Sequence, residues 1–203
     1  MKALINELKK EGVLKNKDIL RAFENVDRKD FVPDIYQNEA YENRPLPTDC
    51  AQTISQPYTV AFMLELLGPK EGERILDVGS GSGWTTSLLS EIVGKKGEVI
   101  GTEIIPELVK FGQTNLSKYN FKNSKIVNSK GTLGNPDDAP YDRILVSAAA
   151  KILPEPLIEQ LHVGGTMVIP VKDAIWKVTR TTELETDIEK HHGFIFVPLV
   201  TKP

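Results

Sequence analysis

The decapeptide from Arg74 to Gly83, which reads R-I-L-D-V-G-S-G-S-G, constrains the fold more than any other part of the 203-residue chain. Ile75, Leu76 and Val78 form a short apolar run that suits a buried parallel strand. The alternating glycines permit positive φ angles and let a ligand approach bare backbone. We therefore predict a strand, a ligand-binding glycine loop and then a helix over residues 84–93. The alternative interpretation is an ordinary glycine-rich turn.

The spacing of the glycines narrows the class of ligand. A dinucleotide fingerprint is G-x-G-x-x-G, whereas this loop is G-x-G-x-G followed by Trp84, and it lacks the Gly-Lys-Ser/Thr ending of a phosphate-binding loop. About twenty residues further on, a strand-like run ends at Glu103, whose carboxylate can accept hydrogen bonds from both hydroxyls of a ribose. An adenosine ligand without phosphate fits best, which predicts S-adenosylmethionine as the cofactor. Taken alone, Glu103 could equally be a solvated acid at a strand end.

Helix-like and strand-like segments alternate along most of the chain, and glycines 164 and 165 are expected to form a turn into one late strand. This alternation predicts an α/β, Rossmann-like fold with a mostly parallel sheet, helices on both faces and an antiparallel edge. Together with the cofactor expected at the glycine loop, it leads us to expect the fold of an S-adenosylmethionine-dependent methyltransferase. The expected helices cover residues 3–10, 18–26, 58–67, 84–93, 106–119 and 155–161. The expected strands cover residues 75–78, 98–102, 125–128, 142–147, 166–171, 176–183 and 194–199.

Residues 27–57 form an unusual front segment, with four prolines and few periodic patterns. A long irregular stretch in a compact domain is usually functional or disordered, and the apolar content here argues against disorder. We expect a single methyltransferase domain over residues 1–203. Within it, residues 1–57 would form an N-terminal cap and active-site loop, and residues 58–203 the cofactor-binding core.

Composition excludes several classes of partner. The formal net charge is -3 and the pI is about 5.7, which disfavours a nucleic-acid partner. No apolar run approaches the roughly 20 residues of a membrane span, and the charged N-terminal segment does not resemble a signal peptide. The only cysteine suits a reducing compartment, and no Cys/His cluster has metal-ligand spacing. We expect a cytoplasmic monomer without a metal, a nucleic-acid partner or a membrane partner.

Specific segments also lie before and after the glycine loop. Residues 28–33 read R-K-D-F-V-P, residues 41–47 read Y-E-N-R-P-L-P and residues 52–57 read Q-T-I-S-Q-P. Together with A-P-Y-D at 139–142, E-Q-L at 159–161 and F-V-P-L at 196–199, they resemble the protein-L-isoaspartate (D-aspartate) O-methyltransferase family over nearly the whole chain. The glycine loop is shared by many S-adenosylmethionine methyltransferases, whereas the T-I-S-Q-P and R-K-D-F-V-P segments are far more specific.

The resemblance implies repair of damaged proteins. Such enzymes transfer a methyl group from S-adenosylmethionine to the free carboxylate of L-isoaspartyl residues in proteins and peptides, and the ester then collapses to a succinimide. A carboxylate is already ionised at neutral pH, so alignment with the methyl carbon and exclusion of water remain as the tasks of the protein. The alternatives are a carboxyl methyltransferase of another peptide substrate and a degenerate homologue that still binds an isoaspartyl peptide or the cofactor but turns over poorly.

The same resemblance makes Ser55 the catalytic residue, whose hydroxyl can donate a hydrogen bond to the substrate carboxylate. The alternative role is an N-cap for the helix that begins near Pro57. Asp77 is expected either to accept hydrogen bonds from the glycine-loop amides or to contact the methionine part of the cofactor. The three histidines are interpreted as surface residues. The residues expected at the cofactor are Thr53, Ile54, Asp77, Gly79, Ser80, Gly81, Gly83, Glu103 and Gly131.

Two positions depart from the family pattern. Ser129-Lys130-Gly131 stands where the family usually has Gly-Asp-Gly, and an ammonium cannot accept a hydrogen bond from the adenine amino group. The lost bond would cost on the order of 1 kcal/mol, and we expect Lys130 to point into solvent. Cys50-Ala51 stands where glycine is more usual, and Cys50 is interpreted as a small packed or partly exposed residue rather than a nucleophile.

Overall fold

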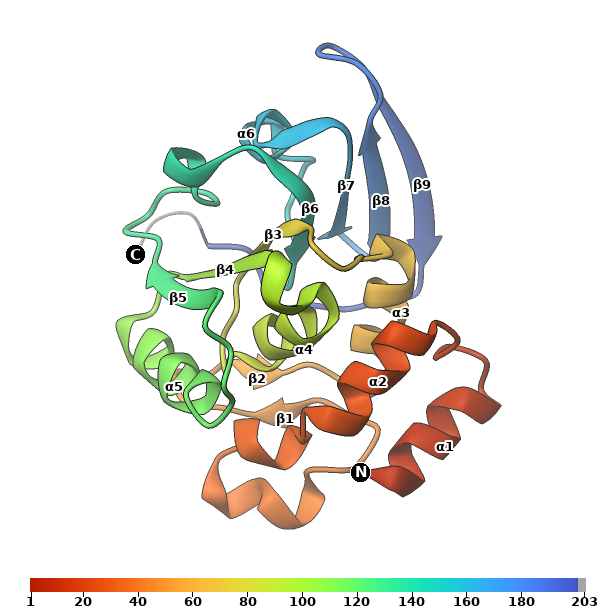
Figure 1. Cartoon of the computed structure of the whole chain (residues 1–203), viewed down its shortest axis with the longest axis vertical. Coiled ribbons are helices and arrows are strands. Elements are labelled where there is room, and N and C mark those ends of the chain that lie inside the picture. Colours follow the sequence, from red (N-terminus) through yellow and green to blue (C-terminus); the bar gives the residue numbers. More distant parts are fainter. Residues whose placement is uncertain (201–203) are drawn as a thin grey trace.

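The computed structural model describes residues 1–200, and seven strands in it form one sheet (Figure 1). The strand order is β5-β4-β3-β6-β7-β8-β9. Pairing is parallel from β5 to β7, and β8 and β9 add an antiparallel edge, as predicted. The strands are β3 (Arg74–Val78), β4 (Glu98–Glu103), β5 (Ser124–Asn128), β6 (Tyr141–Val146), β7 (Leu161–Val171), β8 (Ala174–Arg180) and β9 (Thr186–His192).

Helices cover both faces of this sheet because successive strand residues point to opposite sides. Ile75 of β3 belongs to the apolar cluster that includes α4, whereas the next residue, Leu76, belongs to the cluster that includes Leu157 of α6. The predicted α/β fold is therefore confirmed. The helices are α1 (Lys2–Lys10), α2 (Lys17–Asn25), α3 (Pro57–Leu67), α4 (Trp84–Val93), α5 (Pro106–Leu116) and α6 (Glu155–Glu159).

The order of the strands determines where a ligand can bind. From β3 the chain proceeds through β4 to β5 on one side, and it then returns to form β6 on the other side of β3. In an open α/β sheet, ligands bind beyond the carboxyl ends of the strands at such a switch point. The glycine loop after β3 lies at this position.

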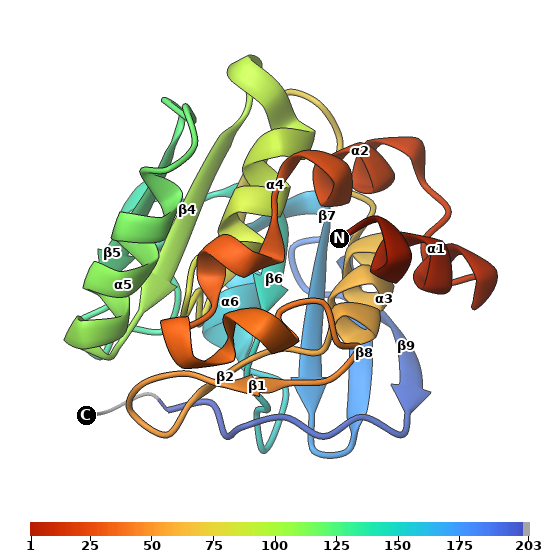
Figure 2. The same cartoon turned by 90° about the horizontal axis from the view of Figure 1, so that it is seen from below.

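The segment before α3 is irregular but well packed. It contains two 3-10 helices, η1 (Arg28–Phe31) and η2 (Asp34–Glu39), and a short hairpin of β1 (Leu46–Pro47) and β2 (Thr53–Ile54). Figure 2 shows the hairpin running along the same side of the molecule as the C-terminal segment. Phe31, Leu46 and Ile54 are buried in one apolar cluster with the core helices. The expectation that this segment is ordered is confirmed.

The C-terminal part differs from the prediction. Residues 194–199 do not form a sheet strand; they run as an extended segment that exchanges hydrogen bonds with Ala149, whose N–H donates to Val197 O (2.8 Å) and whose carbonyl accepts from Leu199 N–H (2.8 Å). The last strand is instead β9, whose polar T-D-I-E-K-H-H sequence carries almost no apolar signal because it is an edge strand. The expected turn at Gly164 and Gly165 is also wrong, since both lie within β7 beside a register shift.

Candidate active site

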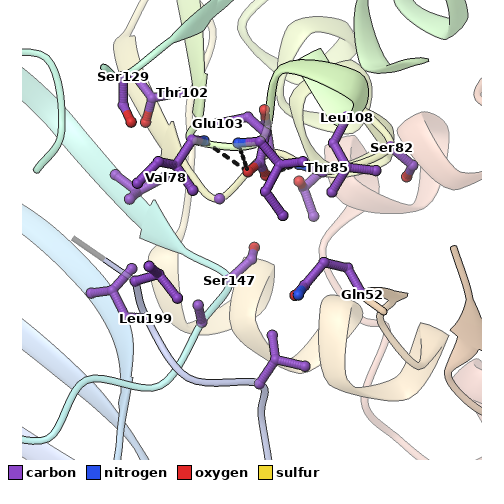
Figure 3. A pocket seen from close by; sticks show the side chains of 18 of the residues that line it. Gln52, Val78, Ser82, Thr85, Thr102, Glu103, Leu108, Ser129, Ser147 and Leu199 are labelled. Atoms are coloured by element: carbon purple, nitrogen blue, oxygen red, sulfur yellow. Dashed lines mark hydrogen bonds between the residues drawn. The ribbon is translucent and has the colours of Figure 1, made fainter. Parts of the chain in front are cut away.

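A cleft of about 950 Å³, part of it open to solvent, lies beyond the carboxyl ends of the central strands. Four parts of the chain build it: the glycine loop, the residues after β4, β5 and β6, the β1–β2 hairpin with Ser55, and residues 197–200. Figure 3 shows Glu103 and Gln52 on opposite sides of this space.

The glycine loop forms one wall of the cleft with its backbone. Gly79, Ser80 and Gly81 line the cleft, and a Cβ added to Gly79 (φ 75°) would meet no atom within 4 Å. Open space at this position allows a ligand to lie directly against the main chain. Gly83, also expected at the cofactor, does not line the cleft. Its Cβ would lie 3.0 Å from the carbonyl oxygen of Gly112, which indicates that Gly83 allows α4 and α5 to pack closely.

Glu103 holds its carboxylate at the cleft through backbone donors. The Oε1 atom accepts hydrogen bonds from the N–H groups of Ile104 (2.7 Å) and Ile105 (3.0 Å), and Oε2 accepts from Gly81 N–H (3.1 Å) (Figure 3). The side chain is 7% exposed. The interpretation as a solvated acid is therefore wrong. A carboxylate with two oxygens has further lone pairs, which can accept the two hydroxyls of a ribose.

Asp77 lies behind the glycine loop and does not line the cleft. Its Oδ2 accepts hydrogen bonds from the hydroxyls of Thr85 (2.7 Å) and Thr86 (2.6 Å), not from the loop amides, so that part of the expectation is wrong. Its Oδ1 is buried without a partner among the described residues. Burial, reinforced by the nearby negative charge of Glu103, raises the pKa of Asp77 to about 6 against the opposing effect of the two hydroxyls.

Ser55 lies in the segment between β2 and α3. It lines the cleft together with Thr53 and Ile54, as expected from the resemblance. Helix α3 begins at Pro57 with Gln56 as its N-cap, and no side chain caps it. The capping role considered for Ser55 is therefore wrong. Among residues 1–200 its hydroxyl has no hydrogen-bond partner, so that it is free to bind a ligand.

The segment that follows β5 also reaches the cleft, but by different residues from those expected. Ser129 and Thr132 line it, whereas Gly131 does not. The side chain of Lys130 is exposed, which confirms that it points into solvent, and its N–H donates to Asn128 Oδ1 (2.7 Å).

Several lining residues were not found from the sequence. Ser147 follows β6, and the rule that ligands bind at strand ends could have identified it. Thr48 and Gln52 belong to the hairpin, and Leu199 belongs to the C-terminal segment. No pattern within those segments indicates the contact, because they reach the cleft only through tertiary packing.

The remaining candidates do not line the cleft. His162 and His192 are exposed, as expected, whereas His191 is half-buried against Phe62, with ring centroids 5.2 Å apart. Cys50 is exposed, and partial desolvation together with nearby carboxylates raises the pKa of its thiol, which makes it a poorer nucleophile. Over residues 1–200, no group of three or more His, Cys, Asp or Glu side chains could hold a metal ion. Over the same residues, no helix is both long and apolar enough to cross a membrane.

The residues around the glycine loop fit a polar nucleoside ligand. Ser80 Oγ and Trp84 Nε1 are buried and lack hydrogen-bond partners among the described residues, and both residues line the cleft. A buried polar atom without a partner is costly, so such atoms commonly mark a place where a ligand or water binds. Together with the carboxylate of Glu103 and the open backbone at Gly79, these two polar atoms can form hydrogen bonds with the polar groups of S-adenosylmethionine.

The fold and this cleft define an S-adenosylmethionine-dependent methyltransferase. A family model described as Protein-L-isoaspartate(D-aspartate) O-methyltransferase matches residues 1–203. The chain belongs to this family. The expected family, enzyme class and cofactor are thereby confirmed.

Individual relatives agree over nearly the full length. Protein-L-isoaspartate O-methyltransferase of Methanopyrus kandleri is 43% identical over 202 residues, which cover 97% of this chain and 89% of the relative. The enzyme of the same name from Pyrococcus horikoshii is 42% identical, with 98% and 92% covered. A solved structure of a protein-L-isoaspartate O-methyltransferase from Plasmodium falciparum, in complex with S-adenosyl-L-homocysteine, has a TM-score of 0.88 at 27% identity and covers 99% of this chain and 98% of that chain.

Proposed function

We propose that this chain methylates the free carboxylate of L-isoaspartyl residues in damaged proteins and peptides, and so initiates their repair through a succinimide. The proposal rests on one observation: two different sets of residues line two walls of the same cleft. One wall has the nucleoside-binding groups of the glycine loop and Glu103, and the other has Ser55 with an unpartnered hydroxyl. The T-I-S-Q-P segment that supplies Ser55 is the most family-specific part of the sequence.

The residues around the glycine loop would hold the cofactor. Glu103 would accept the ribose hydroxyls, while Ser80 and Trp84 would offer hydrogen-bonding groups that otherwise remain buried and unpaired. Bound S-adenosylmethionine supplies an electrophilic methyl group on a sulfonium. Asp77 would act indirectly, because it accepts hydrogen bonds from the hydroxyls of Thr85 and Thr86 at the start of α4.

Ser55 would orient the substrate. A hydrogen bond from its hydroxyl would hold one carboxylate oxygen and leave the other directed at the methyl carbon. No general base is required because the substrate carboxyl is ionised at neutral pH. The hairpin and residues 197–200 border the same space and would keep water from the reacting atoms.

We also propose that residues 1–203 act as one methyltransferase domain and as a monomer, with residues 1–57 as cap and active-site loop. Support comes from the apolar cluster that joins cap residues to α3 and α4, and from a cleft built by a single chain. We place the protein in the cytoplasm, where the reduced state of Cys50 would be maintained. Analytical ultracentrifugation that detects a dimer at micromolar concentration would contradict the monomer.

The decisive experiment incubates the protein with methyl-labelled S-adenosylmethionine and two peptides that differ only in an isoaspartyl or a normal aspartyl residue. We expect base-labile label on the isoaspartyl peptide alone. Label on neither peptide despite cofactor binding would favour another peptide substrate, and failure to bind cofactor would favour an inactive homologue.

The role of Ser55 is tested separately with Ser55→Ala. Loss of one well-aligned hydrogen bond at the reacting group is expected to lower kcat by about 10-fold to 100-fold while the Kd for S-adenosylhomocysteine changes by less than about 2-fold. Thr114→Ala, at an exposed position of α5, is the control. Full turnover in Ser55→Ala would show that the hydroxyl does not orient the substrate.

A further inference from the structure

Arg28 is fully buried in η1, far in sequence from the cofactor-binding residues. Its guanidinium donates hydrogen bonds to four backbone carbonyl oxygens that lie in separate parts of the cap. The acceptors are Ala40 O (2.9 Å), Glu42 O (3.2 Å), Arg44 O (3.0 Å) and Ser55 O (3.1 Å). One arginine side chain therefore ties the loop at residues 40–44 to the residue that we place at the substrate.

The partners of Arg28 are unusual for a buried arginine. Buried charges are normally paired with an opposite charge. Among residues 1–200, no carboxylate forms an ion pair with Arg28; the guanidinium carbon lies 5.3 Å from the centre of the Trp84 ring instead. Burial and the positive charge of Arg44 lower the pKa of Arg28 to about 10, so that it remains protonated at neutral pH.

The contacts of Arg28 join both walls of the cleft. Ser55 belongs to the substrate wall, and Trp84 is the first residue of α4 after the glycine loop and lines the cofactor wall. The loop that Arg28 holds also fixes the start of α3, because Asn43 Oδ1 accepts from Tyr58 N–H (3.0 Å) and Asn43 O accepts from Gln56 Nε2 (2.9 Å). Arg28 therefore bonds to Ser55 itself, while the loop bonds to Gln56 and Tyr58, which follow Ser55 in the chain.

We propose that Arg28 is a positioning residue for methyl transfer, which sets the Ser55 hydroxyl relative to the cofactor wall without touching cofactor or substrate. The inference rests on the proposed function of Ser55. It follows from geometry: the guanidinium is planar, with donors directed along fixed lines, and it can reach four carbonyls and an aromatic face at once. A lysine ammonium in the same place keeps the charge but cannot span these acceptors.

The test compares Arg28→Lys and Arg28→Gln with the wild type in kcat, KM for an isoaspartyl peptide and Kd for S-adenosylhomocysteine. We expect kcat, counted per cofactor-binding molecule, to fall by about 10-fold to 100-fold in Arg28→Lys, since misplacement by about 1 Å can have such an effect. The Kd for S-adenosylhomocysteine should change by less than about 3-fold. Arg143→Lys, which weakens a half-buried ion pair with Glu73 at the far end of the sheet, is the control and should lower stability alone.

A double-mutant cycle separates positioning from a purely structural role. If Arg28 acts through Ser55, Arg28→Lys should change kcat by less than about 3-fold when Ser55 is already alanine. Additive losses would overturn the proposal, as would parallel losses of kcat and cofactor affinity, or variants that no longer bind cofactor at all. Failure of the proposed function itself is distinguishable, because the wild type would then label no isoaspartyl peptide.

Discussion

The stability of the cofactor-free protein should depend on the ionisation of Asp77, and Asp77→Asn is the perturbation that tests it. The carboxyl is fully buried, one of its oxygens lacks a partner among the described residues, and burial raises its pKa from the ordinary 3.8 to about 6. The native state therefore holds a proton in a pH range where the unfolded state has released it. The ionised group destabilises the native state, and the asparagine variant cannot ionise.

The magnitude follows from the two pKa values. A difference of about 2 between them corresponds to a loss of about 3 kcal/mol in unfolding free energy, which begins near pH 4 and is complete above about pH 6. Stability from this group thus falls as pH rises through that window. Between about pH 4.5 and about pH 7.5 the variant should gain about 2 kcal/mol relative to the wild type. Changed hydrogen bonds to Thr85 and Thr86 add an offset that does not vary with pH.

Urea unfolding of both proteins without cofactor, across this pH range, measures the difference directly. Asp138→Asn is the control of opposite sign, because hydrogen bonds from Asn135 and Lys125 lower the pKa of the Asp138 carboxyl. That variant should lose stability relative to the wild type as pH rises, by a small amount since the Asp138 carboxylate is partly exposed to solvent. A free-energy difference for Asp77→Asn that is flat or falls with pH would refute the reasoning.

Two further substitutions test the cofactor wall by titration with S-adenosylhomocysteine. Gly112→Ala would place a Cβ 2.8 Å from the carbonyl oxygen of Gly81, so we expect a loss of about 1–3 kcal/mol in stability and weaker cofactor binding, whereas Thr114→Ala on the same helix should leave affinity unchanged. Unaltered affinity in Gly112→Ala would show that the glycine loop tolerates displacement. Lys130→Asp restores an acceptor beside the cleft and should tighten binding several-fold, with Lys122→Asp as control. No gain would place position 130 away from the adenine.

The parts of the fold that the sequence predicts well are those with a strong local pattern. Helix α4 has the predicted bounds, and β3 begins one residue before the predicted start. These elements are easy to predict because a buried apolar run and flanking glycines mark their ends in the sequence. Strand β9 was missed because an edge strand exposed to solvent needs few apolar residues. The alternation of the central elements was enough to predict the sheet and the position of its ligand site.

The residues of the candidate site also divide into those with a local sequence signal and those without one. The positions of Gly79, Ser80, Gly81 and Glu103 at the cleft were predicted because these residues lie in short sequence motifs at the ends of two strands. Gly83 packs against Gly112 and does not line the cleft, because a glycine needed for helix packing has the same local sequence as one that faces a ligand. The lining residues from the hairpin and the C-terminal segment depend on long-range packing, which leaves no local signal.

The substrate wall presents a physical problem that the cofactor wall does not. The glycine loop is held by the parallel sheet, whereas the segment that carries Ser55 has only a two-residue hairpin to position its backbone. Its position must come from side chains, and the structure has them: Arg28 holds four carbonyls, and Tyr119 of the α5 region accepts from Asp27 N–H (2.9 Å) and donates to Asp30 Oδ2 (2.8 Å). The bond from Tyr119 fixes η1 and therefore Arg28 itself. An irregular segment can thus hold a reacting group because buried polar side chains replace the hydrogen bonds that a regular element would provide.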